Sequence, residues 1–197
     1  MSKNGLVVIA AYQQVSTVEM DSINKNQPEH NRENLVSNAA VEKIKELVKK
    51  ANTCFFCTTV AIGESIGIRP MSVQEVDDDG NLWFLSASDS HKNHELSIDP
   101  SVKLYFQGSA HSDFLYLDGI ATVSHDKAKI KELWKFIIKT WFTEGEDDPR
   151  IRVIKVTPRA GYYWDTKHGN AVAGVKMLIG ATLGVTLDDS IEGTITV

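Results

Sequence analysis

The sequence lacks the features of a membrane-spanning or nucleic-acid-binding protein. None of its apolar runs approaches the roughly 20 residues that cross a bilayer. The apolar stretch of residues 6–11 is too short for a signal-peptide core, and no small-residue cleavage site follows it. A net charge of −5 argues against a broadly basic face, although it leaves room for a local cationic pocket. We therefore expect a soluble cytoplasmic protein with neither a membrane nor a nucleic-acid partner.

Cysteine is scarce: the chain has two, Cys54 and Cys57, in a C-x-x-C spacing that suits a redox or metal pair. The surrounding residues 53–60 are β-branched and aromatic, which favours a strand. Side chains three apart on a strand point to opposite faces, with Cα atoms roughly 10 Å apart, too far for a disulfide. No second C-x-x-C or paired histidine completes a zinc site. We favour a strand interior over a redox or metal pair.

The rest of the composition is typical of one globular domain with a real core. Hydrophobic residues make up 42% and charged residues 24% of the 197 positions. Residues 1–36 are polar, rich in Asn, Gln and Ser, and predict a mobile or loosely docked arm. We assign residues 37–170 to the main domain and residues 171–197 to a C-terminal extension.

Two segments have helical periodicity. The first begins near Ser37, a good N-cap residue, and ends near residues 51–52. Its apolar positions follow a 3.6-residue spacing: Val41, Ile44, Leu47 and Val48. The second follows Asp126 and carries a broad apolar stripe: Ile130, Leu133, Trp134, Ile137, Ile138 and Trp141.

Short β-branched and aromatic runs between the helices predict strands. They are Cys54–Ala61, Ile68–Val76, Leu82–Ala87, Ser101–Gln107, Phe114–Val123, Ile151–Thr157 and Gly161–Trp164. An Asp-Gly pair in residues 77–81 supplies the positive φ of a hairpin turn. Short antiparallel strands around a few helices predict a mainly β fold with α additions, closed as a barrel.

Residues 84–96 pass from strand to turn to helix and offer a place for an anion. Ser90 is the expected N-cap, and a helix N-terminus has free N–H groups and a partial positive charge that suit a phosphate. Lys92, in the first turn, opposes the helix dipole and makes more sense with an anion in front of it. A surface helix with a solvated lysine is the alternative that the spacing leaves open.

Arg69 is a second candidate for the same anion. It precedes Pro70, which cannot donate to a ladder, so we expect this stretch at a sheet edge or bulge. An arginine beside the Ser90 turn can bind a phosphate through two N–H groups, whereas an ordinary surface arginine is the alternative. The two cations converge if the strands on either side of the Asp-Gly hairpin pair.

Several segments together resemble a known family. Residues 69–72 (Arg-Pro-Met-Ser), 82–86 (Leu-Trp-Phe-Leu-Ser) and 90–92 (Ser-His-Lys) resemble the pyridoxamine-phosphate-oxidase-like split-barrel flavoproteins. Residues 133–150 and the later Tyr-Trp-Asp of residues 163–165 resemble the general-stress-protein branch of that superfamily. The resemblance covers about residues 37–170, and the order and spacing of the segments are more specific than any one of them.

The resemblance implies a split β-barrel homodimer with two FMN sites at its interface. The arginine and the 90–92 turn would hold the phosphate, residues 85 and 86 would face the ring or ribityl chain, and two tryptophans would approach from the partner subunit or close the cleft. Core packing is the alternative for both tryptophans. The implied cofactor-binding residues are Arg69, Pro70, Met71, Ser72, Leu85, Ser86, Ser90, His91, Lys92, Trp141 and Trp164.

One departure narrows the expected function. The oxidases proper have an Arg-Leu-His-like segment for pyridoxine at the place where residues 165–169 are Asp-Thr-Lys-His-Gly. This difference argues against vitamin-B6 oxidase activity, but it does not affect the expected flavin binding. We expect an FMN-dependent oxidoreductase of unknown substrate. The alternatives are a non-catalytic flavin-binding or sensing stress protein, and a split barrel that binds haem or a deazaflavin. His91 and His94 lie one helical turn apart, but no third ligand stands at a fixed spacing, so we predict no metal.

Overall fold

The computed structural model describes residues 30–134, 140, 142, 144–169 and 189–197. Most of the predicted arm, Trp141 and most of the predicted C-terminal extension lie outside these residues. In chain order the elements are β1 (Leu35–Val36), α1 (Ser37–Ala51), β2 (Thr53–Thr58), β3 (Ile68–Ser72), β4 (Glu75–Val76), β5 (Leu82–Ala87), α2 (His91–Ile98), β6 (Ser101–Gln107), β7 (Phe114–Ser124), α3 (Lys127–Leu133), the 3-10 turn η3 (Gly145–Asp147), β8 (Ile151–Thr166) and β9 (Ser190–Thr196).

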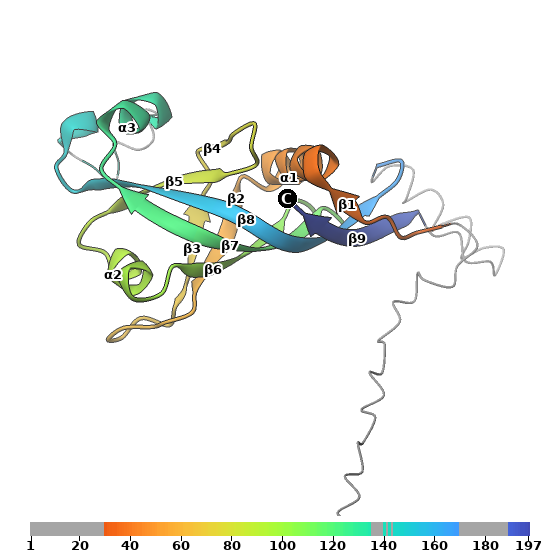
Figure 1. The fold of residues 1–197 in the computed structure, drawn as a ribbon, viewed down its shortest axis with the longest axis horizontal. Helices are drawn as coiled ribbons and strands as arrows, with labels where there is room; N and C mark the ends of the chain where they lie inside the picture. Colours follow the sequence, from red (N-terminus) through yellow and green to blue (C-terminus); the bar gives the residue numbers. More distant parts are fainter. Residues whose placement is uncertain (1–29, 135–139, 141, 143, 170–188) are drawn as a thin grey trace, which may run out of the picture.

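A single sheet with the order β1-β9-β8-β7-β6-β2-β3 forms the frame of the molecule. The long strand β8 divides it: one edge of β8 pairs with β7, and the other pairs with β5 at residues 151–156 and with β9 at residues 160–166. Figure 1 shows α1 against the sheet and α2 and α3 towards the end opposite β9. The expected mainly β fold with a few helices is therefore confirmed.

The barrel closes where the chain changes its pairing partner. The sequence predicts one strand over residues 68–76, but β3 pairs with β2 and β4 pairs with β5. The change occurs at Val73 and Gln74, whose N–H groups donate to the carbonyl oxygens of Asn52 and Trp83. The prediction of one uninterrupted strand was wrong because an extended sequence pattern does not reveal a change of partner. The expected edge position of Pro70 is confirmed, since β3 ends the sheet order.

The main core lies between α1 and the inward faces of the strands. The four predicted apolar residues of α1 are all buried: Val41, Ile44, Leu47 and Val48. On the strand side, the rings of Phe56 and Phe84 meet edge to face at 5.4 Å. Fully burying such a side chain contributes about 1.5–3 kcal/mol, so this cluster supplies much of the driving force for closure.

A second, smaller core lies under α3. Ile130 and Leu133 pack there with Phe142 and Ile151, which confirms the start of the predicted stripe. The helix ends earlier than expected, because Trp134 has the extended conformation of a C-cap (φ −65°, ψ 124°). The remainder of the stripe lies outside the described residues.

Three local boundaries differ from prediction. Ser37 is not the N-cap: Val36 holds that position in an extended conformation because β1 pairs with β9, and Ser37 is the first helical residue. The strand predicted to reach Ala61 ends at Thr58. The last two predicted strands are one, β8, whose pairing with β7 shifts register between Asp118 and Gly119 and leaves Arg159 of β8 without a partner residue in β7.

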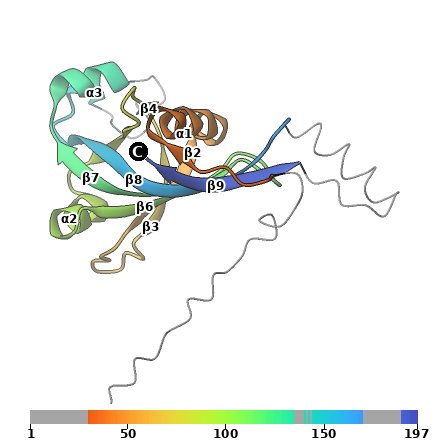
Figure 2. The same cartoon turned by 45° about the vertical axis from the view of Figure 1, so that its right-hand side comes forward.

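The residues before α1 lie on the C-terminal strand. β1 pairs in parallel with β9, and the hydroxyl of Tyr163 donates to the carbonyl oxygen of Glu33 at 2.9 Å. A Cβ on Gly193 would overlap that same carbonyl oxygen, so only glycine allows the close approach. Figure 2 shows β1 alongside β9. No helix among the described residues is both long and apolar enough to cross a membrane.

Candidate functional site

Four of the predicted phosphate residues line one surface depression. Arg69 comes from β3, whereas Ser90, His91 and Lys92 come from the cap and first turn of α2. Together with residues 64–66 and 68 they surround a volume of about 470 Å³. The expected route to this convergence was wrong, because β3 does not pair with β5. The cations meet because β2, the partner of β3, ends at Thr58 beneath α2.

The start of α2 has the predicted cap. The Ser90 hydroxyl accepts from the N–H of Asn93 and lies 3.2 Å from the hydroxyl of Ser86 at the end of β5. The imidazole of His91 lies 3.1 Å from the carbonyl oxygen of Ile62, in the loop that forms the opposite rim. The capped N-terminus of α2 therefore stands at the floor of the depression, beside both cations.

Arg69 is held by three acceptors. Its Nη2 donates to Glu95 at 2.6 Å and to the Ser65 hydroxyl at 3.0 Å, and its Nη1 donates to the Thr58 hydroxyl at 3.2 Å. A guanidinium has five N–H groups. In the described part of the chain the other two meet no acceptor, so they remain for a ligand.

Glu95 is the residue of this site that sequence analysis missed. Its side chain is completely buried. Burial alone would raise the pKa of the carboxyl, but hydrogen bonds from Ser65, Thr58 and Arg69 lower the pKa to about 2, so Glu95 is ionised at neutral pH. The available signal was an acidic residue one helical turn after Lys92, but its burial and its partners depend on long-range packing.

Lys92 is the cation of the depression whose charge is most easily lost. Burial, and secondarily the positive charge of Arg69, lower the pKa of Lys92 to about 8, while the charge of Glu95 opposes that shift. A bound anion would favour the charged form. Lys92 is half-buried, so part of its side chain is removed from solvent.

Two other predicted residues, Pro70 and Trp164, meet in a separate groove. It has a volume of about 760 Å³, and its lining includes the aromatic side chains of Phe55, Tyr105 and Trp164 on the outer sheet face. We call five rings of that face the outer aromatic face: Phe55, Tyr105, Tyr116, Tyr162 and Trp164. Their strands place them in register, Phe55 opposite Tyr105, Tyr105 opposite Tyr116, and Tyr116 opposite Tyr162. Phe55 is 59% exposed, Tyr105 45% and Trp164 44%.

The remaining predicted residues that the structure describes line neither the depression nor the groove. Met71 packs on the main core and Leu85 on the smaller one. Ser86 is buried next to Ser90, whereas Ser72 is exposed. Trp141 lies outside the described residues.

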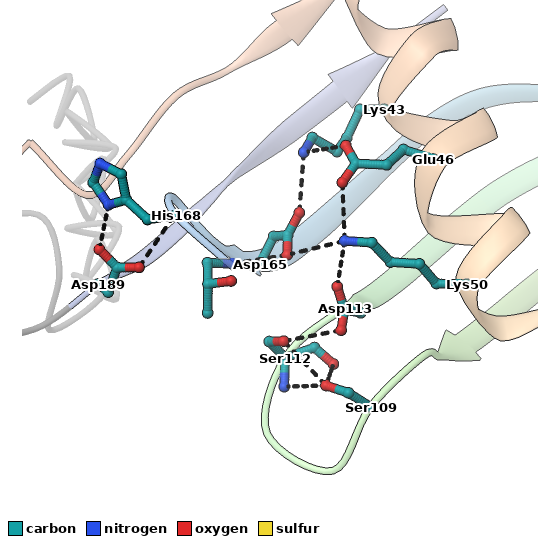
Figure 3. Close-up of polar contacts among 10 residues, drawn as sticks. Lys43, Glu46, Lys50, Ser109, Ser112, Asp113, Asp165, His168 and Asp189 are labelled. Carbon is teal, nitrogen blue, oxygen red and sulfur yellow. Dashed lines mark hydrogen bonds and ion pairs between the residues drawn. The ribbon is translucent and has the colours of Figure 1, made fainter. Parts of the chain in front are cut away.

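A polar network, drawn in Figure 3, links α1 to Asp113 and Asp165, and Asp165 also lines the groove. Lys43 donates to the buried Asp165 at 3.0 Å, and Lys50 donates to the buried Asp113 at 2.6 Å and pairs with Glu46 at 2.9 Å. The hydrogen bonds to Asp113 and Glu46 outweigh burial and raise the pKa of Lys50. Sequence analysis missed this network, although two lysines seven residues apart lie on one helical face.

The segment that departs from the oxidases takes part in these contacts. Asp165 is held by Lys43, and the His168 ring lies 2.7 Å from the buried carboxylate of Asp189 in Figure 3. The side chains of Asp165 and His168 therefore make their polar contacts with other residues of the protein.

The cysteines lie in a strand, as predicted. Both belong to β2 and both thiols are free. Burial raises the pKa of Cys54 to about 12 and also raises the pKa of Cys57, so neither thiol is activated as a nucleophile.

A barrel closed by a chain that passes from one strand partner to another is the arrangement of a split-barrel protein. The model of the family described as "Pyridoxamine 5'-phosphate oxidase like" matches residues 39–188. The chain belongs to this family, which confirms the resemblance found in the sequence.

Known relatives and solved structures agree with the fold. Protein bli-3 of Neurospora crassa is 25% identical over 115 residues, which are 54% of this chain and 49% of that protein, so the chain spans about half the length of this relative. A candidate general stress protein 26 from Jannaschia sp. CCS1 has a TM-score of 0.67 at 21% identity, covering 79% of this chain and 97% of that one. A general stress FMN/FAD binding protein from Xanthomonas citri has a TM-score of 0.52 at 23% identity, covering 60% and 82%.

The environment of Lys92 predicts a distinctive titration. One lysine should titrate near pH 8 in NMR spectra of protein labelled at lysine Cε, and its signal should be absent in Lys92→Arg. Arg69→Gln removes a repelling charge and should raise that midpoint, whereas Glu95→Gln removes an attracting charge and should lower it. A spectrum in which every lysine titrates above about pH 10, the ordinary range, would contradict the assignment.

Proposed function

We propose that this chain is an FMN-binding protein and that the depression at Arg69 and Lys92 takes the flavin phosphate. The observation that carries the proposal is the convergence of two cations and the capped start of α2 in one place. A phosphate monoester is close to a dianion at neutral pH, and two cations with free N–H groups match it in charge and hydrogen bonding. Family membership and the FMN/FAD-binding neighbour from Xanthomonas citri support the same ligand.

The residues present fit the whole of such a cofactor. The free edge of β3 and the Ser86 hydroxyl stand next to the phosphate residues and suit a ribityl chain. A flat apolar ring needs apolar and aromatic walls, which the groove at Pro70 and Trp164 offers. When bound, a flavin supplies electron or hydride transfer, and the protein binds, orients and shields it.

We also propose that the protein is a homodimer joined through the outer aromatic face. Exposed rings on neighbouring strands form a continuous apolar surface of the kind that stable interfaces bury. A second copy on this face would place its own Trp164 near the flavin of the first. This arrangement accounts for why so many large apolar side chains share one solvent-facing surface.

Loss of either phosphate cation should weaken FMN binding selectively. Lys92→Ala and Arg69→Ala should each reduce affinity by about 1.5–3 kcal/mol, the range of a hydrogen bond to a charged group. Riboflavin, which has no phosphate, should bind equally to all three proteins in a flavin-fluorescence titration. Lys45→Ala, on the exposed face of α1, is the matched control, and circular dichroism checks folding. Equal losses for riboflavin would show that the phosphate lies elsewhere.

A charge on the outer aromatic face should separate the subunits. Tyr105→Glu should convert a dimer to a monomer in analytical ultracentrifugation, because a carboxylate would be buried without a partner. Ile98→Glu, at an exposed apolar position on α2, should leave the dimer intact. A wild-type protein that sediments as a monomer at micromolar concentration would refute the proposed interface.

We propose further that the bound flavin exchanges electrons with a substrate, which makes the protein an oxidoreductase. After anaerobic photoreduction, a physiological organic acceptor should reoxidise the flavin with turnover when a nicotinamide donor is supplied. Stopped-flow absorbance of the flavin bands measures this rate. Reoxidation by air alone, with no donor or acceptor supporting turnover, would instead favour a protein that binds or senses flavin.

A further inference from the structure

We propose that Glu95 is the positioning residue of the phosphate site, because it fixes the Arg69 guanidinium in the direction that a phosphate requires. The inference rests on the proposed FMN site and deepens it. The acid touches no expected cofactor atom, and it would act mainly through the arginine.

One carboxylate joins all the segments that surround the depression. Glu95 Oε2 accepts from Arg69 Nη2 of β3 at 2.6 Å and from the Thr58 hydroxyl at the end of β2 at 2.7 Å. Its Oε1 lies 3.4 Å from the N–H of Ile62 in the rim loop. Glu95 itself belongs to α2, the helix whose first turn carries Ser90 and Lys92. The relative placement of the two cations therefore depends on this side chain.

The contacts of Arg69 show why positioning matters. A free arginine side chain samples many rotamers, and ordering it costs about 2 kcal/mol of entropy. Here Glu95, with the hydroxyls of Ser65 and Thr58, has already ordered it and engages three of its five N–H groups. The ligand then meets two N–H groups in fixed positions, which is the benefit of preorganisation.

Charge alone would suggest the opposite role, in which Glu95 repels the phosphate or competes for Arg69. Two features argue against it. The Glu95 carboxylate is completely buried and engaged on both oxygens, away from the open side of the depression. Its charge also helps to keep Lys92 protonated against the nearby Arg69. Neutralising Glu95 would thus loosen one cation and weaken the other.

The test compares FMN with riboflavin in Glu95→Gln, which keeps the size of the side chain and removes its charge. FMN affinity should fall 10- to 100-fold, while riboflavin affinity should stay within twofold of wild type. In an Arg69→Ala background the same substitution should change FMN affinity less than threefold, because the arginine that Glu95 positions is absent and Lys92 no longer has a repelling charge beside it. Glu42→Gln, which removes an exposed carboxylate paired with Lys45 on α1, is the control and should change neither affinity.

Thr58→Val provides a second test should Glu95→Gln fail to fold. It removes a hydroxyl that is hydrogen-bonded to both Arg69 and Glu95. FMN affinity should fall by less than in Glu95→Gln, and riboflavin affinity should again be unchanged. Unchanged or tighter FMN binding in a folded variant, or equal losses of both flavins, would overturn the positioning role. Failure of wild type to bind FMN would instead refute the proposed function itself.

Discussion

The ion pair between Arg69 and Glu95 holds together the part of the molecule that gives the fold its chemistry. A buried carboxylate is expensive unless it is paired and fully hydrogen-bonded, and Glu95 meets that condition through β2, β3 and the rim loop together. Removing one partner of such a pair costs about 3–5 kcal/mol, because the other charge is left buried alone. The loop, the edge strand and the start of α2 are therefore constrained by one contact, and the depression between them keeps its shape.

The strand change at Val73 and Gln74 makes this contact possible. If residues 68–76 had paired with both β2 and β5 along their whole length, β3 would lie inside the sheet and its outer backbone would be covered. Because the chain passes instead from β2 to β5, β3 remains at an edge, where Pro70 costs no ladder bond and Arg69 reaches the end of α2. The same step closes the main core under α1. Closure of the barrel and exposure of the cationic depression thus have one cause.

Local signals in the sequence were enough to predict the helices and strands, but they did not predict which strands pair or which polar residues are buried. The apolar spacing of α1, the Asp-Gly hairpin and the Ser90 cap depend on residues within a few positions of one another, and each was predicted. Ser37 failed as a cap because a strand partner 160 residues away fixes Val36. Arg69 and Lys92 were expected to meet through pairing of β3 with β5, but β3 pairs with β2. Glu95 was missed because a glutamate on a short helix is normally predicted to be exposed, and its burial depends on partners that are distant in the sequence.

The depression and the groove, the two parts of the candidate site, differ in whether their polar side chains are available to a ligand. In the depression, Lys92 and two N–H groups of Arg69 stay available to a ligand. Beside the groove, Asp165 and His168, which stand where the oxidases have a substrate-binding segment, are engaged with Lys43 and Asp189. Selectivity among flavins would then come from the phosphate end, where charge is free to act. The groove contributes shape and apolar contact, which tolerate a wider range of planar molecules than hydrogen-bonding groups do.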